Sequence, residues 1–234
     1  MSTSTQLKPI KVWGKGGPNP PKVAIALKEL GIPHEIVPIP LSDVKTPDYV
    51  AINPNGRLPS IQDPNTDMTL WESGAILLYL IDKYDPEHKF SFAPGTPEWY
   101  HAQQWLFFQT TGQGPYYGQA AWFKKFHHER LPSAVERYVK EANRVTAVLE
   151  GHLARQREVF GEEAIKASGG PWLVGNKYSY ADLAWVSWQL ILPMIISKED
   201  GLDLDQYPVV ADWVDRMNKR PAVQYGMGTS EELK

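Results

Sequence analysis

Short apolar runs alternate with turn residues along the first 85 residues of the chain. Residues 10–13 and 34–40 have strand-like patterns, and residues 20–30 between them carry apolar side chains at helical spacing. Asn19 and the two prolines after it suit a helix N-terminus, because proline lacks an N–H that would have no helical partner there. These three segments predict a βαβ unit with parallel strands.

The pattern then predicts a short helix, a hairpin and a final helix. The short helix is expected over residues 46–52, and residues 58–61 and 68–71 are the two strands of the hairpin. The last helix, over residues 75–81, is almost entirely apolar and is therefore expected to be buried. The predicted order of elements is β-α-β-α-β-β-α.

Beyond this point the apolar positions recur at helical intervals, and we predict no pair of strands. Four helices are expected, over residues 99–111, 131–160, 180–196 and 209–218, and the second is long enough to contain a break. Ser179 and Asp182 have the spacing of a capping box at the start of the third helix, so we expect both to be structural.

A loop rich in proline, glycine and acidic residues separates the two patterns. We therefore expect an α/β domain over residues 1–85, a linker over residues 86–98 and an all-helical domain over residues 99–234.

Composition excludes several kinds of chemistry. The 234 residues include no cysteine, so we expect no disulfide, no thiolate metal site and no mechanism with a protein thiol. The net charge of −3 lacks the basic excess of a nucleic-acid-binding protein. The six histidines do not have metal-ligand spacing, and neither a phosphate-binding loop nor a serine nucleophile elbow occurs. We therefore expect no metal and no nucleic acid.

The distribution of apolar residues also argues against export and against a membrane span. Residues 1–9 lack the apolar core of a secretory signal. The longest apolar stretch, over residues 183–196, is interrupted by polar residues and is shorter than the roughly 20 residues that a membrane span needs. We expect a cytoplasmic protein without a membrane span, and the lack of cysteine is compatible with that location.

Three polar segments are brought together by the predicted order of elements, because open α/β sheets bind ligands beyond their strand ends, near helix N-termini. Asn19 follows the first strand, Arg57 precedes the third, and Glu72 and Ser73 precede the last helix. A helix N-terminus with a hydroxyl binds an anion, whereas Glu72 prefers an ammonium group. The pair therefore predicts a receptor for the zwitterionic end of an amino acid. Alternatively, both residues only cap the helix.

Several motifs resemble the signature segments of cytosolic glutathione transferases. They are Asn53-Pro-Asn-Gly-Arg-Leu-Pro59, Trp71-Glu-Ser-Gly-Ala-Ile76 and Gly175-x-x-x-Ser-x-Ala-Asp182. The nu-class and fungal nitrogen-regulator-like branch is similar in further segments, which are Pro18-Asn19 with Lys22-Val-Ala-Ile25, and Gly112-Gln-Gly-Pro115 with Gly118-Gln119. The resemblance extends over about residues 11–222.

This resemblance implies a thioredoxin-like N-terminal domain, an all-helical C-terminal domain and a homodimer that binds glutathione as a substrate. Carried onto this sequence, it implies that Pro59 is a cis-proline and that the Leu58 backbone pairs with the cysteinyl unit. Glu72 and Ser73 would hold the γ-glutamyl ammonium and carboxylate, and Arg57 would pair with the glycyl carboxylate or the loop around it.

One departure from many relatives decides the expected mechanism. Those relatives place a Tyr, Ser or Cys after the first strand to stabilise the glutathione thiolate, and residues 13–21 contain none of these. Asn19 matches the branch in which an asparagine amide approaches the sulfur, where it can only act as an N–H donor. Alternatively, its side chain caps its own helix, or serves both purposes through different atoms. Lys15 is the other nearby source of positive charge, although we expect it to be solvated.

The second substrate is expected to bind between the N-terminal loop and the first helices of the second half. Residues that would line this pocket are Lys15, Tyr116, Tyr117, Gln119, Trp122 and Phe123. Aromatic residues at helical spacing also suit a core or a dimer interface, and this alternative stays open.

We therefore expect a detoxifying glutathione transferase. It would conjugate hydrophobic electrophiles, reduce peroxides, or reduce disulfides with two glutathione molecules. The alternative is a non-enzymatic binding or regulatory protein with the same fold. The nitrogen regulators carry a long Asn/Gln-rich N-terminal segment, whereas only residues 1–8 precede the domain here, which favours the enzyme.

Overall fold

The structure is a computed structural model that describes residues 6–228 of the chain. Residues 1–5 and 229–234, the ends of the two domains expected from the sequence, lie outside the described residues. Of the segment 1–9, for which the sequence predicted no secretory signal, the structure describes only residues 6–9.

Contacts divide the chain into two compact units. The first contains the residues up to Pro86 together with those from Pro221 onward, and the second is Glu87–Arg220. The boundary after Pro86 falls inside the expected linker. The sequence-based division placed residues 221–234 with the helical part, whereas in the structure residues 221–228 pack with the first unit.

The first unit contains a four-stranded sheet with the order β2-β1-β3-β4. The strands are β1 (Ile10–Trp13), β2 (His34–Val37), β3 (Ser60–Asp63) and β4 (Met68–Trp71). β1 and β2 are parallel, and β3 is antiparallel to both β1 and β4. This arrangement is the thioredoxin-like sheet that the resemblance implied, and its elements follow one another in the order that the pattern predicted.

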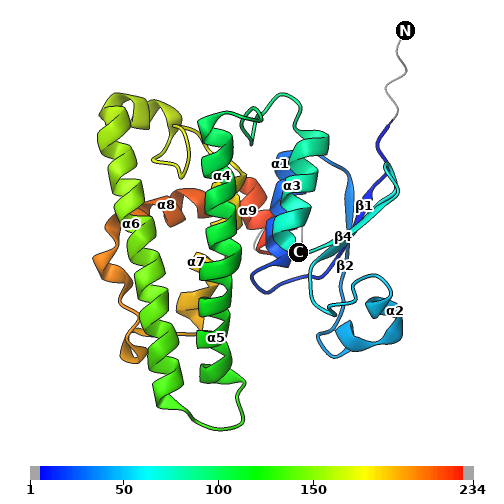
Figure 1. Cartoon of the computed structure of the whole chain (residues 1–234), viewed down its shortest axis with the longest axis horizontal. Coiled ribbons are helices and arrows are strands. Elements are labelled where there is room, and N and C mark those ends of the chain that lie inside the picture. Colours follow the sequence, from blue (N-terminus) through cyan, green and yellow to red (C-terminus); the bar gives the residue numbers. More distant parts are fainter. Residues whose placement is uncertain (1–5, 229–234) are drawn as a thin grey trace. The chain divides into compact units, whose positions relative to one another are not determined.

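Two helices cover one side of the sheet, α1 (Pro20–Glu29) and α3 (Ser73–Tyr84), as Figure 1 shows. Their inward side chains, among them Ile25, Leu27, Ile76 and Leu80, are completely buried. The short helix α2 (Pro47–Val50) follows a 3-10 turn over Asp43–Lys45. A second cluster, built from Trp13, Val44 and Tyr49, packs this segment against β1.

The last described helix, α9 (Pro221–Gly226), packs on α1. A Cβ atom added at Gly226 would lie 2.4 Å from Ile25 Cγ1, so the two helices approach as closely as a glycine allows. The Tyr225 hydroxyl lies 3.0 Å from His34 Nε2, and the Lys28 ammonium lies over the Tyr225 ring. These contacts are the physical reason why the segment after Arg220 belongs with the first unit.

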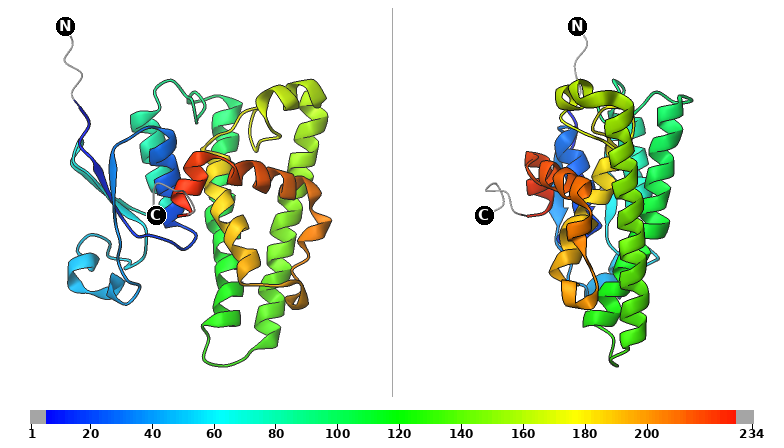
Figure 2. Two further views of the ribbon diagram at one scale, coloured as in Figure 1. Left: turned by 180° about the vertical axis from the view of Figure 1, so that it is seen from behind. Right: turned by 90° about the vertical axis from the view of Figure 1, so that its left-hand side faces the viewer.

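The second unit is helical, and its described residues contain no strand. Its helices are α4 (Pro97–Phe108), α5 (Gly114–Lys125), α6 (Pro132–Ser168), α7 (Tyr180–Ile191) and α8 (Pro208–Asn218), with 3-10 turns over Leu192–Met194, Lys198–Asp200 and Leu204–Gln206. α5 and α6 run side by side (Figure 2). α7 ends earlier than predicted because Pro193 has no N–H with which to continue the helix.

The sequence pattern missed α5, because glycine and proline normally indicate a loop. A π-helical segment over Gln109–Gln113 joins α4 to α5 without a loop. Pro115 falls in the first turn of α5, where its missing N–H is tolerated. Gly118 lies inside α5 beside the Trp188 ring, where a Cβ atom would make an ordinary contact at 3.5 Å.

The long helix α6 is interrupted at Gly161, one residue beyond the predicted helix end, rather than within residues 131–160. Gly161 has φ 76° and ψ 160°, a conformation that lies outside the helical region and that glycine adopts readily. Helical residues continue on both sides of it, so α6 ends at Ser168 rather than near residue 160.

The capping box at the start of α7 forms as predicted. The Ser179 hydroxyl accepts a hydrogen bond from the Ala181 N–H, and Asp182 Oδ2 accepts one from the Ser179 N–H. Asp182 is completely buried, and its Oδ1 also accepts the N–H groups of Leu173 and the Trp213 indole, at 3.0 and 3.1 Å. Burial raises the pKa of Asp182 to about 6, although these hydrogen bonds act in the opposite direction. Asp182 therefore joins three segments of the unit.

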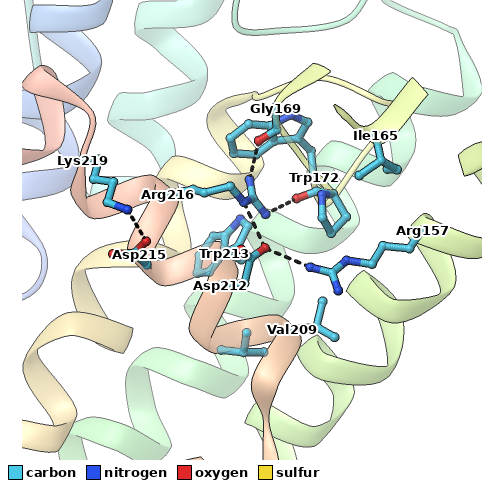
Figure 3. Close-up of polar contacts among 12 residues, drawn as sticks. Arg157, Ile165, Gly169, Trp172, Val209, Asp212, Trp213, Asp215, Arg216 and Lys219 are labelled. Atoms are coloured by element: carbon cyan, nitrogen blue, oxygen red, sulfur yellow. Dashed lines mark hydrogen bonds and ion pairs between the residues drawn. The ribbon is translucent and has the colours of Figure 1, made fainter. Parts of the chain in front are cut away.

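A groove of about 580 Å³ lies between the end of α6 and α8. Charged side chains of both signs line it, and Asp212 pairs with both Arg157 and Arg216 across it (Figure 3). Asp212 on α8 thus links Arg157 of α6 to Arg216 of its own helix.

Arg216 holds the end of α6 in place. Its two terminal nitrogens donate to the carbonyl oxygens of Gly169 and Pro171, at 2.8 and 2.9 Å. Its guanidinium also lies 4.7 Å from the centre of the Trp172 ring (Figure 3). This planar group makes contacts in several directions at once, which a lysine ammonium cannot reproduce.

Arg216→Lys is therefore expected to lower the free energy of unfolding by about 1–2 kcal/mol, since two carbonyl contacts and the ring contact are lost. The matched control is Lys219→Ala on the same helix, which removes only an exposed pair with Asp215. That change is expected to cost less than about 0.5 kcal/mol. Urea denaturation measures both, and equal losses would contradict the role assigned to Arg216.

Candidate functional site

One edge of the sheet brings the predicted site segments together. Trp13 of β1 pairs with Ser60 of β3, and Ser60 pairs with Trp71 of β4. The next residues beyond this row are Gly14, Pro59 and Glu72. The first loop, the proline motif and the start of α3 therefore meet at one place, as the predicted topology required.

The first loop approaches the proline motif very closely. A Cβ atom at Gly14 would lie 3.1 Å from both Leu58 Cβ and Pro20 Cγ, and Gly14 has φ 112°, which favours glycine. The peptide bond between Leu58 and Pro59 is cis, as the resemblance implied. The start of α1 and the Leu58 side chain thus both lie close to Gly14.

Asn19 is the residue before the first turn of α1 and is half-buried. Within the described residues its side chain makes no hydrogen bond that caps α1. The capping alternative therefore does not hold in this structure, and the helix N-terminus lies beside the Asn19 amide. Lys15 is exposed on the glycine-rich loop.

The loop before Pro59 is fixed by two buried side chains. The Tyr49 hydroxyl and Asn53 Nδ2 both donate to the Arg57 carbonyl oxygen, each at 2.7 Å. Asn53 Oδ1 accepts the Asn55 N–H at 2.9 Å, which closes an Asx turn. The Arg57 backbone is therefore held rigidly, while the residue itself is exposed. No role for Tyr49 follows from the sequence, because its partner lies across a loop.

Glu72 and Ser73 lie at the N-terminus of α3. Glu72 has φ 72°, which is unfavourable for a residue with a side chain, and its side chain makes no capping bond within the described residues. Asn55 Nδ2 lies 3.4 Å from Glu72 Oε1. Ser73 begins the helix and is 7% exposed. A carboxylate therefore stands next to a hydroxyl and unpaired helical amides, as a zwitterion receptor requires.

Two lysines near this edge were not assigned from the sequence. Lys22, in the first turn of α1, is buried, and burial lowers its pKa to about 7, partly offset by the charge of Glu72. The sequence feature that could have indicated the burial of Lys22 is that the residues on both sides of it are apolar. Lys45 Nζ donates to the Asn55 carbonyl at 2.8 Å and thereby supports the same turn as Asn53.

Apart from Lys15, the side chains predicted to line a substrate pocket belong to α5 in the second unit, and the prediction for one of them is wrong. Tyr117 is completely buried, and its hydroxyl bonds to Thr146 Oγ1 and Gln189 Nε2 at 2.7 and 3.0 Å. Burial raises the pKa of Tyr117 to about 12. The structure therefore places Tyr117 in the helical core, because its hydroxyl has inward partners.

The other predicted residues on α5 reach the surface to different degrees. Trp122 is 49% exposed and Gln119 is exposed. Phe123 stacks on Tyr138 with ring centres 5.7 Å apart, and Tyr116 is half-buried. Trp122 and Gln119 are therefore the most accessible to a bound substrate, whereas Tyr116 and Phe123 are only partly accessible.

Neither a metal-ligating cluster nor a membrane-spanning helix occurs among the described residues. No group of three or more acidic, histidine or cysteine residues within 6–228 has a geometry that would hold a metal ion. No helix in this part of the chain combines the length and the apolar character that a membrane crossing needs.

Comparison with known proteins matches both units. The family model of the glutathione S-transferase N-terminal domain matches residues 17–83, and that of the C-terminal domain matches residues 115–221. The glutathione S-transferase-like protein tpcF of Aspergillus fumigatus is 63% identical over 222 residues, which cover 94% of this chain and 96% of that protein.

Two further matches extend the comparison. The transcriptional regulator URE2 of Saccharomyces cerevisiae is 37% identical over 233 residues, which cover 89% of this chain and 64% of that protein. The crystal structure of the glutathione transferase URE2P8 from Phanerochaete chrysosporium with oxidized glutathione has a TM-score of 0.84 and 38% identity, with 99% of this chain and 98% of that chain covered.

These matches confirm the resemblance seen in the motifs, including its nitrogen-regulator-like branch. They cover the sheet unit and the helical unit in the order in which the motifs occur. The chain belongs to the glutathione S-transferase family.

Proposed function

We propose that this protein is an enzyme that binds glutathione at the sheet edge, keeps its sulfur ionised and uses it to attack a second substrate. The observation that carries the proposal is the paired row of Trp13, Ser60 and Trp71. That row brings Asn19, the Leu58 backbone and the Glu72–Ser73 pair around one place.

The γ-glutamyl end is assigned to the start of α3. Its ammonium group would bind the Glu72 carboxylate, and its carboxylate would bind the Ser73 hydroxyl and the first amides of the helix. The backbone of Leu58 would pair with the cysteinyl unit, because a cis bond to Pro59 turns the chain there. Arg57 is exposed beside this segment and suits the glycyl carboxylate.

The sulfur is assigned to the start of α1. The Asn19 amide would donate to the thiolate, and the partial positive charge of the helix N-terminus would add to it. Neither group accepts the thiol proton, so the proton leaves to solvent when glutathione binds. Asn19 is thus proposed to act electrostatically.

Three reactions use such a thiolate. In conjugation the sulfur forms a bond to carbon and a leaving group departs. In peroxide reduction two glutathione molecules supply two electrons, so the hydroperoxide becomes an alcohol and water while the two glutathiones become glutathione disulfide. In disulfide reduction the bound thiolate attacks the glutathionyl sulfur of a mixed disulfide that already contains one glutathione, so glutathione disulfide forms and the other thiol leaves. The chain has no cysteine, so that route needs two glutathione molecules. The relative URE2P8 was crystallised with oxidized glutathione, which is the disulfide that this route produces.

The remaining expectations follow from this proposal. Tyr116, Gln119, Trp122 and Phe123 on α5 are proposed to contact a hydrophobic second substrate. We also propose a homodimer in the cytoplasm and a role in detoxification.

Calorimetry with glutathione tests the binding site. The wild type is expected to bind, and Glu72→Gln and Ser73→Ala are each expected to weaken binding about tenfold, since each removes a contact to a charged group. Glu87→Gln is the control, because it changes an exposed carboxylate that pairs with Lys89 in the other unit. A wild type without affinity for glutathione, or unchanged affinity in both site variants, would refute the proposed site.

A regulatory function is the second candidate, since 89% of the chain matches the regulator URE2. The two functions differ in turnover. Assays with a chlorodinitrobenzene, a hydroperoxide and a mixed disulfide distinguish them: activity in any one supports the enzyme, whereas glutathione binding without turnover in all three supports the regulator.

A further inference from the structure

Asn55 lies in a turn, over residues 53–56, whose backbone is fixed from two sides. The Asn55 N–H donates to Asn53 Oδ1 at 2.9 Å, and the Asn55 carbonyl oxygen accepts from Lys45 Nζ at 2.8 Å. The Gly56 N–H donates to the Asn53 carbonyl oxygen at 2.8 Å and closes the turn. Both backbone polar groups of Asn55 therefore have partners, which set the place from which its side chain starts.

Close packing at Gly56 holds the same turn. Gly56 is buried and has φ 58°, a conformation that favours glycine. A Cβ atom there would lie 2.6 Å from the Val44 carbonyl oxygen and 2.9 Å from Lys45 Nζ, so a larger residue would push the two segments apart. The turn is therefore held closely against residues 44–45, and Asn55 projects from a rigid base.

The side chain of Asn55 makes a separate contact, with the start of α3. Its Nδ2 donates to Glu72 Oε1 at 3.4 Å, and both residues are exposed. A hydrogen bond of this length in contact with water adds little to stability. Glu72 also has φ 72°, an unfavourable conformation of the kind that is found at functional sites. The contact therefore points to what the Glu72 carboxylate binds rather than to folding.

We propose that Asn55 is a positioning residue for glutathione, whose side-chain amide orients the Glu72 carboxylate toward the γ-glutamyl ammonium. An ionised carboxylate has two acceptor oxygens, so Oε1 accepts from Asn55 while Oε2 receives the ligand. A hydrogen bond that already restricts the carboxylate reduces the rotamer freedom that is lost on binding. The inference rests on the proposed function, because it takes Glu72 as the receptor of this ammonium.

Asn55→Ala tests the inference, since it removes the amide and leaves the backbone contacts of the turn. Its affinity for glutathione in calorimetry is expected to fall about fivefold, with an unchanged urea midpoint. Asn55→Ser is a second variant with the same expected loss, because serine also suits turns but has no amide. Asn218→Ala is the control, as Asn218 is exposed at the end of α8 in the other unit, and it is expected to bind glutathione as the wild type does.

Glutaryl-cysteinyl-glycine, which is glutathione without its ammonium group, shows on which end of the ligand Asn55 acts. This analogue is expected to bind the wild type and Asn55→Ala equally, because Glu72 then has no ammonium to receive. A general distortion of the turn would instead weaken the binding of glutathione and of the analogue by the same factor.

A double-mutant cycle shows whether Asn55 acts through Glu72. The Asn55→Ala and Glu72→Gln changes together are expected to weaken glutathione binding no more than Glu72→Gln alone, because the carboxylate that Asn55 orients is then absent. The cycle uses glutathione itself, so it decides the question even where the analogue binds too weakly to measure.

Several outcomes would overturn the inference. Wild-type affinity for glutathione in both Asn55→Ala and Asn55→Ser would do so, as would equal losses for glutathione and the analogue or fully additive losses in the cycle. A wild type that does not bind glutathione refutes the proposed function itself. A wild type that binds, with unaltered Asn55 variants, refutes only the role of Asn55.

Discussion

Asn19→Ala is expected to lower kcat/KM at neutral pH by about 10- to 100-fold, with little change in glutathione affinity. A free thiol with a pKa of about 8.5 is only a few per cent ionised at neutral pH. Lowering that pKa by about two units needs roughly 2.7 kcal/mol of preference for the thiolate. An amide donor to a charged group supplies about 1.5–3 kcal/mol, which is a large part of this requirement.

The pH dependence of kcat/KM measures this effect directly. The apparent pKa of bound glutathione is expected to rise by about one to two units in Asn19→Ala, because only the thiolate loses a hydrogen bond. Asn19→Asp is expected to be slower still, since a carboxylate beside the sulfur repels the thiolate. Lys15→Ala is the control, as Lys15 is exposed on the neighbouring loop. An unchanged profile in Asn19→Ala would remove Asn19 from the mechanism.

Asp182→Ala is expected to lower the free energy of unfolding by about 3–5 kcal/mol. The change leaves the buried N–H groups of Leu173 and the Trp213 indole without their acceptor and also opens the capping box at Ser179. These groups come from three separate segments of the helical unit, so their partners are lost together. Urea denaturation of the whole chain measures the loss.

Ser179→Ala is the matched comparison at the same helix start. It removes a helix cap alone and is expected to cost about 1 kcal/mol. A similar loss in Asp182→Ala would show that the contacts to Leu173 and Trp213 contribute little.

Ionisation of Asp182 is also expected to make the free energy of unfolding depend on pH. Its folded pKa of about 6 lies above the ordinary value of 3.8 for an aspartate, so the neutral form favours folding. That contribution is complete below the unfolded pKa and is lost as the pH rises through the folded pKa. The wild type is therefore expected to lose about 3 kcal/mol of stability relative to Asp182→Asn between about pH 4 and pH 7. A pH-independent difference would contradict the raised pKa.

Local patterns predicted most elements because each depends on neighbouring residues. The helix after Asn19 and the capping box at Ser179 formed where the pattern placed them. α5 was missed for the same reason, since its glycines and Pro115 locally indicate a loop. Only the structure shows that the π-helical segment Gln109–Gln113 carries the chain from α4 into α5 without a loop.

The candidate site likewise contains residues that sequence motifs identify and residues that only the folded structure reveals. Asn19, Pro59, Glu72 and Ser73 belong to recognisable motifs, and the predicted topology brings their segments to one edge. The partners that hold these segments could not be predicted, because Tyr49 reaches the Arg57 carbonyl through a side chain that spans a loop.

The sequence by itself determined the order of elements, the lack of any protein thiol and the motifs that lie at the proposed glutathione-binding edge of the sheet. Tertiary structure alone decided that Tyr117 is a core residue, that α9 packs on α1 and that Lys22 is buried. The physical reason is that periodicity and capping act over a few residues, whereas burial and hydrogen-bond partners depend on segments that meet only after folding.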